Sequence, residues 1–515
     1  MKKILPIIAV LLISCTPKIK VLTYNVGSFG KFQENSIPDV AGIIKALDAD
    51  VVSLNELDSC NNRHNSFQLK ELSSVSGLSS LHFASAFPFA GGAYGNGILS
   101  KADIISSETV NLDAHGGYEP RSIAVIETKD YVLASTHLDV SKTGANVLQA
   151  RDLNDWFALH YTGYDKPVLL CGDMNATPES PVIEELSHIW ERVSPIENTY
   201  PSENAEKCID YIFYLKTARS VELVKSKVVK EINGIDVAKA SDHLPVYAEL
   251  KVGPRRKSFN FISMTDTQVG FFDYNSGCMH SDSLFNAATI EINRIKPLLV
   301  VNTGDLIDAP WKEGWELQDS IYRANMAKID PSIEVYEIPG NHDIPPFNEK
   351  NLQKYLELRG YVRFSVVRND CAFIGIDSNC VKDGAEEAEA EQWDWLVGQL
   401  EAAKKCKHRF VFMHCPIIRH EIDEAEDYFN FPKSKRTKYI DMLKEHGVEA
   451  VFSGHTHMDN YAVYDGIQFI NGGAIGNALA RGYPGFWIVN VSDDDVIAEY
   501  VATPLPEGIG PVSIW

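Results

Sequence analysis

The sequence has few of the features that mark disulfide scaffolds or nucleic-acid-binding proteins. Its nine cysteines are scattered and include no CxxC pair, which excludes a disulfide-rich fold. Basic residues are outnumbered, 48 against 70 acidic ones, and the formal net charge is -22. Broad electrostatic binding of nucleic-acid backbones is therefore disfavoured. Small phosphate esters are not excluded, because a bound metal ion can reverse the local field.

No apolar run reaches the roughly 20 residues that a membrane-spanning helix needs. The longest one near the N-terminus, residues 4–13, follows two lysines and is typical of a secretory signal. The string LISC, which ends at Cys15, resembles a bacterial lipobox and implies cleavage before Cys15 and acylation of its thiol. The alternative is an ordinary cleaved signal with an incidental cysteine. We expect residues 1–19 to be signal and tether, and the protein to be exported and lipid-anchored in the bacterial cell envelope.

The length of 515 residues is too great for one ordinary core. Short apolar runs alternate with helix-like stretches over residues 20–252, and the same pattern starts again at residue 258. The Gly/Pro-containing, basic stretch 253–257 between them is typical of a linker. The sequence therefore predicts two domains of similar size, 20–252 and 258–515, in which strands and helices alternate.

In the first half, polar residues recur where strand-like runs end. Each has an ordinary explanation by itself, such as a turn, a cap or a satisfied buried histidine. Together they favour a site, because loops at strand ends assemble sites from distant positions in α/β folds. The set comprises Asn25, Glu56, His137, Asp173, Asn175, Asp210, Asp242 and His243.

This set, together with YGNGILSK, EPRSIAV and TYPSENAEKCIDYIF, resembles the endonuclease/exonuclease/phosphatase superfamily over roughly residues 20–252. The resemblance implies a four-layer α-β-β-α sandwich. It also implies Mg²⁺ or Mn²⁺ held by Glu56 with Asn25 and Asp242 nearby, and Asp173 orienting or activating the attacking water. His137, Asn175 and His243 would contact the scissile phosphate, and Asp210 would orient His243. A hydrated Mg²⁺ ion needs only one or two carboxylates, which agrees with this set.

The second half carries a denser set of polar motifs: MTDTQVG, NTGDLID, IPGNHDIP, FMHCP and SGHTHMD. GNHD together with GHTH resembles the calcineurin-like metallophosphoesterases, over about residues 258–500. The resemblance implies a second four-layer sandwich with two divalent ions, Mn²⁺, iron or Zn²⁺, bridged by Asp305. It assigns Asp266, Gln268 and His457 to one ion, and Asn341, His414 and His455 to the other. His342 would lie over the phosphate as acid or stabiliser, with Asp343 as its partner.

Gln268 departs from the commonest form of this family, which has histidine there, although a subset carries Asp-x-Gln. The amide oxygen of glutamine can bind a metal ion, so the sequence predicts an altered site. The alternative is that Gln268 only makes hydrogen bonds, as most amide side chains do.

We therefore expect a tandem metal-dependent phosphoesterase that acts on small phosphoesters or phospholipid-derived head groups. One alternative is a secreted nuclease, against which the acidic composition counts. The other is a noncatalytic binding protein built on phosphoesterase folds, against which the complete ligand sets count. The sequence indicates no oligomeric state and does not select a substrate, because fold does not determine function.

Overall fold

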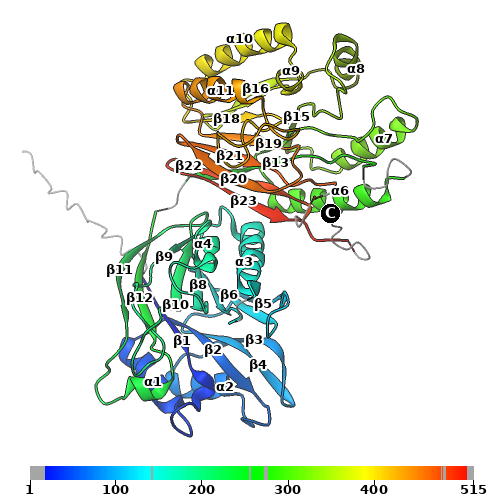
Figure 1. Ribbon diagram of the computed structural model, residues 1–515. Helices are drawn as coiled ribbons and strands as arrows, with labels where there is room; N and C mark the ends of the chain where they lie inside the picture. Colours follow the sequence, from blue (N-terminus) through cyan, green and yellow to red (C-terminus); the bar gives the residue numbers. More distant parts are fainter. Residues whose placement is uncertain are drawn as a thin grey trace, which may run out of the picture. The chain divides into compact units, whose positions relative to one another are not determined.

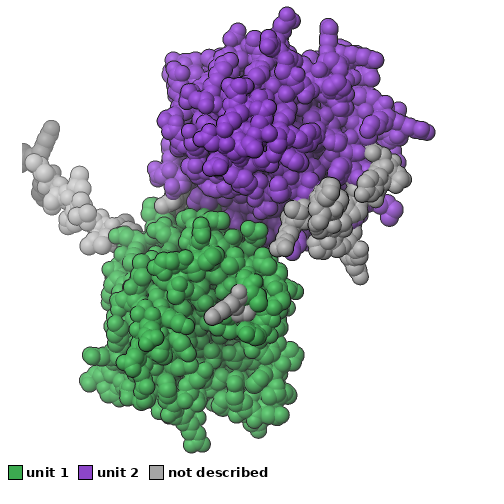
Figure 2. Space-filling view, in the orientation of Figure 1, with its two compact units in different colours: residues 1–154, 163–256 green, residues 155–162, 257–515 purple. Residues whose placement is uncertain are grey.

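The computed structural model describes residues 18–140, 143–254, 257–271, 277–476, 478–479 and 483–506. The chain divides into two compact units, residues 1–154 with 163–256 and residues 155–162 with 257–515 (Figure 2). Among the helices of the described ranges, none has the length and apolar character of a membrane span. The expected signal segment and its Cys15 lie outside the described residues.

The first unit is built on two six-stranded sheets packed on a common core. Leu22 and Leu54 of the first sheet share this core with Leu133 and Leu169 of the second. The first sheet has the order β11 (Val221–Val228), β12 (Val246–Val252), β1 (Lys18–Asn25), β2 (Val51–Ser59), β4 (Gly92–Ser100), β3 (Ser80–Phe89). The second has the order β5 (Ser106–Leu112), β6 (Arg121–Glu127), β7 (Val132–His137), β8 (Val168–Asp173), β10 (Asp210–Leu215), β9 (Trp190–Arg192).

Helices form the outer layers of this unit. In α1 the buried residues Ile37, Val40, Ile43 and Ile44 recur at helical spacing, so one face of the helix is apolar. The helices beside the first sheet are α1 (Ile37–Leu47), α2 (Gln68–Ser76) and the short α5 (Val237–Ala240), and those beside the second are α3 (Ala145–Tyr161) and α4 (Pro181–Leu186) (Figure 1). A short 3-10 turn, η1 (Gly27–Phe29), follows β1.

The second unit also contains two sheets. One has the order β15 (Glu334–Glu337), β14 (Leu299–Asn302), β13 (Ser258–Met264), β22 (Gly485–Ser492), β23 (Val496–Ala502). The other has the order β16 (Phe364–Arg368), β17 (Cys371–Gly375), β18 (His408–Phe412), β19 (Ala450–Ser453), β21 (Ile467–Asn471), β20 (Asn460–Tyr464). The core between them is aromatic: Phe261 of β13 contacts Phe373, Phe410 and Phe452 of the facing sheet, with ring centroids 5.1–5.4 Å apart.

The outer layers of the second unit are again helical. A second core joins Leu396 of α10 (Glu386–Ala402) and Leu443 of α11 (Lys433–Glu445) to Val411 of β18. Figure 1 shows these two helices on one side of the sheets, and α6 (Met279–Ile295) and α7 (Trp315–Met326) on the other. The remaining helices are α8 (Glu349–Arg359) and α9 (Asn379–Lys382).

Both units are thus mixed α/β sandwiches, as the sequence predicts. In each, neighbouring strands run parallel: β1 with β2 and β7 with β8 in the first unit, β13 with β14 and β18 with β19 in the second. Parallel strands end at the same edge of a sheet, so residues that follow them are brought together. This geometry accounts for the two sites described next.

Candidate active sites

The site of the first unit gathers at the ends of β1, β2, β7 and β8. Asn25 ends β1, His137 ends β7 and Asp173 ends β8, while Asp210 begins β10 directly opposite Asp173. Glu56 lies within β2 where the pairing with β4 shifts between Leu54 and Leu57, and its φ of 58° is left-handed. Such irregular, strained backbone is concentrated at functional sites because it redirects a side chain out of the regular pleat.

Asn25 connects the predicted metal ligands to the predicted base. Its buried amide nitrogen donates to Oε1 of Glu56 at 3.2 Å and to Oδ2 of Asp173 at 3.0 Å. Its oxygen accepts from the backbone nitrogen of Gly27 at 3.1 Å. Asn25 therefore fixes the spacing between the metal side and the hydrolytic side of the site.

Lys31 forms ion pairs with two of the predicted metal ligands. Its ammonium lies 3.1 Å from Oδ2 of Asp242 and 3.5 Å from Oε2 of Glu56. The lysine chain crosses Gly27, where an added Cβ would lie only 2.4 Å from Cγ of Lys31 and 2.9 Å from Oδ1 of Asp242. Gly27 also has a left-handed φ of 53°. Two carboxylates that converge on one positive charge agree with the hard oxygen ligands that Mg²⁺ or Mn²⁺ takes.

The part of the site predicted to contact phosphate holds a histidine between two carboxylates. Nδ1 of His243 lies 2.9 Å from Oδ2 of Asp210, and its Nε2 lies 3.6 Å from Oδ2 of Asp173. Burial lowers the pKa of His243, but Asp210 and Asp173 outweigh it and raise that pKa to about 10. Burial and the nearby Asp210 raise the pKa of Asp173 to about 7. Asp173 can thus exchange a proton near neutral pH, and His243 presents an N–H donor.

His137 is kept neutral by its surroundings. The amide of Asn175 donates to Nε2 of His137 and to the carbonyl of Leu138, both at 2.9 Å, so Nε2 is an acceptor. Burial, followed by the charge of Arg121, holds the pKa of His137 well below its usual value. The structure therefore brings all the residues predicted for this site together. Asp173, Asp210 and His243 also offer atoms within 4.8 Å of one another, a spacing that could hold a metal ion.

The site of the second unit is built on two loops that are tied to each other. The backbone nitrogen of Asp266 donates to the carbonyl of Gly304 at 2.9 Å, and that of Gln268 donates to the carbonyl of Asp305 at 2.8 Å. Asp266, Gln268 and Asp305 all have left-handed φ values, 48°, 33° and 53°. The loops that follow β13 and β14 thus hold these side chains in a fixed, strained arrangement.

Asp305 lies at the centre of this site. Its Oδ2 is 3.3 Å from Nε2 of His414, whose Nδ1 lies 3.0 Å from the carbonyl of Thr303. Burial opposes ionisation of Asp305, but His414 and His342 hold its pKa well below the usual range. Asp305, His414 and His455 offer ligand atoms within 4.8 Å of one another. On the other side, Oδ1 of Asp266 lies 3.2 Å from Nε2 of His457. An ionised carboxylate beside imidazoles fits a pair of divalent ions.

Gln268 is oriented by a residue that sequence analysis did not identify. Its Nε2 donates to Oδ1 of Asp308 at 3.1 Å. Its Oε1 is buried and has no hydrogen-bond partner among the described residues. An unpaired buried carbonyl oxygen is costly unless something else binds it. The arrangement favours Gln268 as an oxygen ligand, which stays a prediction.

The expected pairing of His342 with Asp343 is wrong. Nδ1 of His342 lies 3.1 Å from Oδ1 and 2.8 Å from the carbonyl oxygen of Asp308. Asp343 instead accepts from the backbone nitrogens of Gly340 at 2.8 Å and Leu306 at 3.1 Å. It therefore links its own loop to the loop that contains Leu306. Burial lowers the pKa of His342, but Asp305 and Asp308 raise it to about 10. The imidazolium is therefore held by Asp308, and Asp343 is a structural residue.

Other residues that sequence analysis missed support these sites. Asn55 accepts from the backbone nitrogen of Asp173 at 3.1 Å and donates to the carbonyl of Thr136 at 2.8 Å, so it joins the two sheets of the first unit. Tyr428 contacts the predicted ligands Asn341 and His455. Asp308 lies three residues after Asp305 on the same loop, which is a weak sequence signal for the site but does not indicate its pairing with His342. Lys31 and Tyr428 carry no comparable sequence signal.

Comparisons with known proteins agree with the two-unit architecture. The model of the endonuclease/exonuclease/phosphatase family matches residues 22–243, and that of the calcineurin-like phosphoesterases matches residues 260–459. The serine/threonine-protein phosphatase CPPED1 of Homo sapiens is 32% identical over 230 residues, covering 42% of this chain and 72% of the relative. Its counterpart in Bos taurus is 30% identical over 262 residues, covering 47% and 83%.

Solved structures are similar at lower identity. An endonuclease/exonuclease/phosphatase from Beutenbergia cavernae is 19% identical, with a TM-score of 0.40, and covers 48% of this chain and 75% of that one. The mannosyl-6-phosphatase Bt3783 of Bacteroides thetaiotaomicron is 18% identical, with a TM-score of 0.38, and covers 45% and 99%.

Proposed function

Because the chain belongs to the endonuclease/exonuclease/phosphatase family over residues 22–243 and to the calcineurin-like phosphoesterases over residues 260–459, we propose that this metal-dependent phosphoric ester hydrolase processes one small phosphoester in two steps. The first unit opens a phosphodiester of a small molecule or lipid head group. The second unit then removes phosphate from the product. The observation that carries this proposal is the presence of two unlike phosphoesterase domains on one chain, since linkage raises the effective concentration of an intermediate.

In the first unit, Asp173 accepts a proton from the attacking water, because its pKa lies near neutrality. The Nε2–H of His243 binds a phosphate oxygen on which negative charge develops, while the amide of Asn175, whose two N–H groups donate to His137 and to the carbonyl of Leu138, holds His137 in place. Mg²⁺ or Mn²⁺ held by Glu56, Asp242 and Asn25 would supply further charge stabilisation at the phosphate. Asn25 keeps the metal ligands and Asp173 at a fixed distance.

In the second unit, His342 gives a proton to the leaving oxygen, and its contacts with Asp308 support this role because they fix the orientation of the imidazole. Two ions of Mn²⁺, iron or Zn²⁺, held by Asp305 and the neighbouring histidines and amides, would polarise the phosphate and lower the pKa of a bound water. The name of the similar serine/threonine-protein phosphatase CPPED1 supports a monoester as the substrate of this unit.

A phosphoester panel on the full-length chain tests the proposal. Diesters and monoesters of small alcohols, sugars and lipid head groups are assayed beside plasmid DNA, with Mg²⁺ and with Mn²⁺. The proposal expects hydrolysis of both a small diester and a small monoester. Rapid DNA cleavage without activity on small esters would favour the nuclease, and a metal-loaded protein inert on the whole panel would favour the binding protein.

Gln268→Ala is expected to weaken binding of one ion in the second unit by about 10- to 100-fold, the usual loss for a ligand or its close support. Gln268→His should instead strengthen retention of Zn²⁺, because imidazole is a softer ligand than an amide oxygen. Metal titration with phosphatase assays in parallel measures both changes, and Gln353→Ala, at an exposed glutamine of α8, serves as control. If Gln268→Ala equals the wild type in metal content and rate, Gln268 is only a hydrogen-bond partner.

We also propose that the protein acts at the bacterial cell envelope, held by a lipid on Cys15. Cys15→Ala is expected to move the protein from the membrane fraction to the soluble fraction of cells, because an acyl anchor supplies the apolar surface that membrane binding needs. Fractionation followed by immunoblotting measures this, with Cys60→Ala as the matched cysteine control. Membrane association of Cys15→Ala equal to the wild type would exclude the anchor.

A further inference from the structure

A loop of the second unit, residues 419–431, contacts two of the predicted metal ligands and is held by hydrogen bonds to a buried arginine. Arg436 of α11 is fully buried, and its guanidinium donates to the backbone carbonyls of Ile422, Glu424 and Phe431. Asn430, also fully buried, donates to the carbonyl of Ala425 at 2.8 Å. Hydrogen bonds to a buried charged donor are among the strongest in proteins, so this loop has a defined path.

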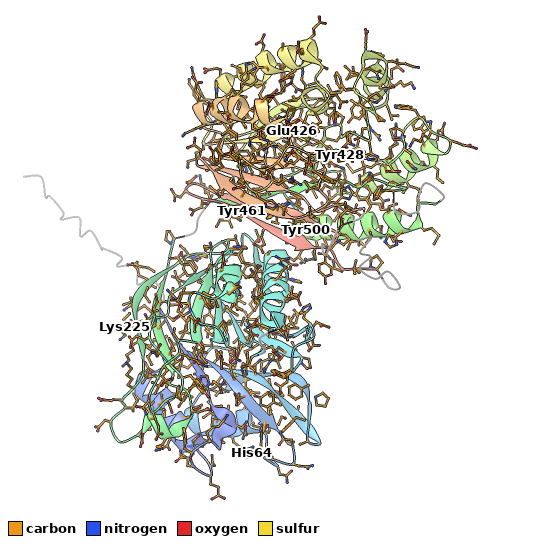
Figure 3. The ribbon with its side chains drawn as sticks, in the orientation of Figure 1. His64, Lys225, Glu426, Tyr428, Tyr461 and Tyr500 are labelled. Carbon is orange, nitrogen blue, oxygen red and sulfur yellow. The ribbon has the colours of Figure 1, made fainter. Side chains whose placement is uncertain are left out.

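Tyr428, which is labelled in Figure 3, lies on this loop and contacts two residues of the site. Its backbone carbonyl lies 3.0 Å from Nε2 of His455, and its hydroxyl accepts from Nδ2 of Asn341 at 2.8 Å. The ring centroids of Tyr428 and His455 are 4.6 Å apart. The residue as a whole is 57% exposed, so its contacts do not arise from burial in a core.

These contacts determine which atoms of Asn341 and His455 remain for a metal ion. A carbonyl can only accept, so Nε2 of His455 carries the proton and Nδ1 is left with its lone pair. The amide nitrogen of Asn341 is directed to Tyr428, so Oδ1 is turned the other way, where it lies 3.0 Å from Nε2 of His414. An amide oxygen and an unprotonated imidazole nitrogen are the forms that bind metals.

We propose that Tyr428 is a positioning residue that sets the amide direction of Asn341 and the tautomer of His455, and thereby assembles the second ion's ligands. The proposal rests on the ligand set of the proposed function. Partners of this kind orient metal ligands and strongly affect affinity. Here one residue serves two ligands, through its hydroxyl and its backbone carbonyl, and Arg436 keeps the loop in place.

A role in packing makes a different prediction. Tyr428 also contacts Phe429, with ring centroids 5.2 Å apart, and phenylalanine would retain the ring contacts with Phe429 and His455. If packing were the whole role, Tyr428→Phe would leave metal binding unchanged. Positioning of Asn341 requires the hydroxyl, whereas the backbone carbonyl that faces His455 is kept in both forms. Tyr428→Phe therefore separates the two roles at Asn341.

The experiment measures Mn²⁺ binding by calorimetry on the full-length chain, with Glu56→Gln in every protein so that the second unit dominates the signal. Tyr428→Phe is made with Asn341 and again with Asn341→Asp. With asparagine, the substitution is expected to weaken binding of one ion by about 10-fold. With aspartate it should have no effect, because a carboxylate presents an oxygen in either orientation. Tyr461→Phe, at an exposed tyrosine whose hydroxyl bonds Gln468, is the control.

The outcomes are distinct. Unchanged binding in Tyr428→Phe overturns the positioning role, and so does a loss that is equally large in the wild-type and Asn341→Asp backgrounds. If Asn341→Ala leaves Mn²⁺ binding unchanged, the ligand assignment of the proposed function fails instead, whatever Tyr428 does. A loss confined to the asparagine form supports the proposal.

Discussion

Asp173→Asn is expected to lower hydrolysis by the first unit by about 10²- to 10⁴-fold, the usual contribution of a positioned general base. Asparagine keeps the size of the side chain and can still accept from Asn25, but it cannot take a proton from water. The substitution also removes one of the two carboxylates that face His243. The measurement is the rate of diester hydrolysis by the full-length variant, with folding checked by circular dichroism.

Asp130→Asn, at an exposed aspartate in the turn between β6 and β7, provides the control for Asp173→Asn. Monoester hydrolysis by the second unit should be unchanged in both variants. A folded Asp173→Asn protein that keeps its diesterase rate would remove Asp173 from the mechanism. Loss of both activities would show that the two sites are not independent.

His414→Ala is expected to abolish hydrolysis by the second unit and to release metal from it. His414 is fully buried, and its Nε2 faces both Asp305 and Asn341. Removing it deletes a predicted ligand and leaves the buried Asp305 carboxylate with less compensation, which is costly. We expect a loss of about 100-fold or more in monoester hydrolysis, since a metal ligand is removed and Asp305 loses its partner. Diester hydrolysis should be retained.

The measurement for His414 combines metal content by mass spectrometry with the two hydrolysis rates. His414→Gln is made in parallel. Glutamine fills most of the space that alanine would leave empty, so this variant still tests the ligand role if His414→Ala unfolds. His408→Gln, a buried histidine on the neighbouring β18, controls for the loss of an imidazole from the core. Full metal content and full monoesterase activity in a folded His414 variant would contradict the ligand role.

The parts of the sites that follow strand ends could be predicted from sequence. Asp173 and His137 each end an apolar run, and β7 and β8 are parallel, so their ends meet at one edge. The same reason brings Asp266 and Asp305 together after β13 and β14. The α/β character of both domains was predictable because apolar runs alternate with helical segments in both halves, whereas the sandwich architecture followed from the resemblance to the two families.

Contacts that depend on the path of a loop could not be predicted. Asp343 is adjacent to His342 in sequence, but its carboxylate turns toward backbone nitrogens, and the true partner, Asp308, comes from another loop. Tyr428 reaches the site because Arg436 determines the course of its loop through backbone carbonyls. Hydrogen bonds to backbone atoms leave no residue pattern, so only the structure shows them.

The side chain of Lys31, which passes over Gly27, places a positive charge beside the predicted metal ligands of the first unit. Its ammonium already serves as the counter-charge of Glu56 and Asp242, so a divalent ion that binds there displaces one cation with another. Metal loading would then depend on a competition between the ion and the Lys31 ammonium for the same two carboxylates. In the second unit, Asp266 and Asp305 are paired instead with the imidazoles of His457 and His414. Protons would compete there in the way that the lysine competes in the first unit, so the two units should differ in how salt and acidity govern their metal occupancy.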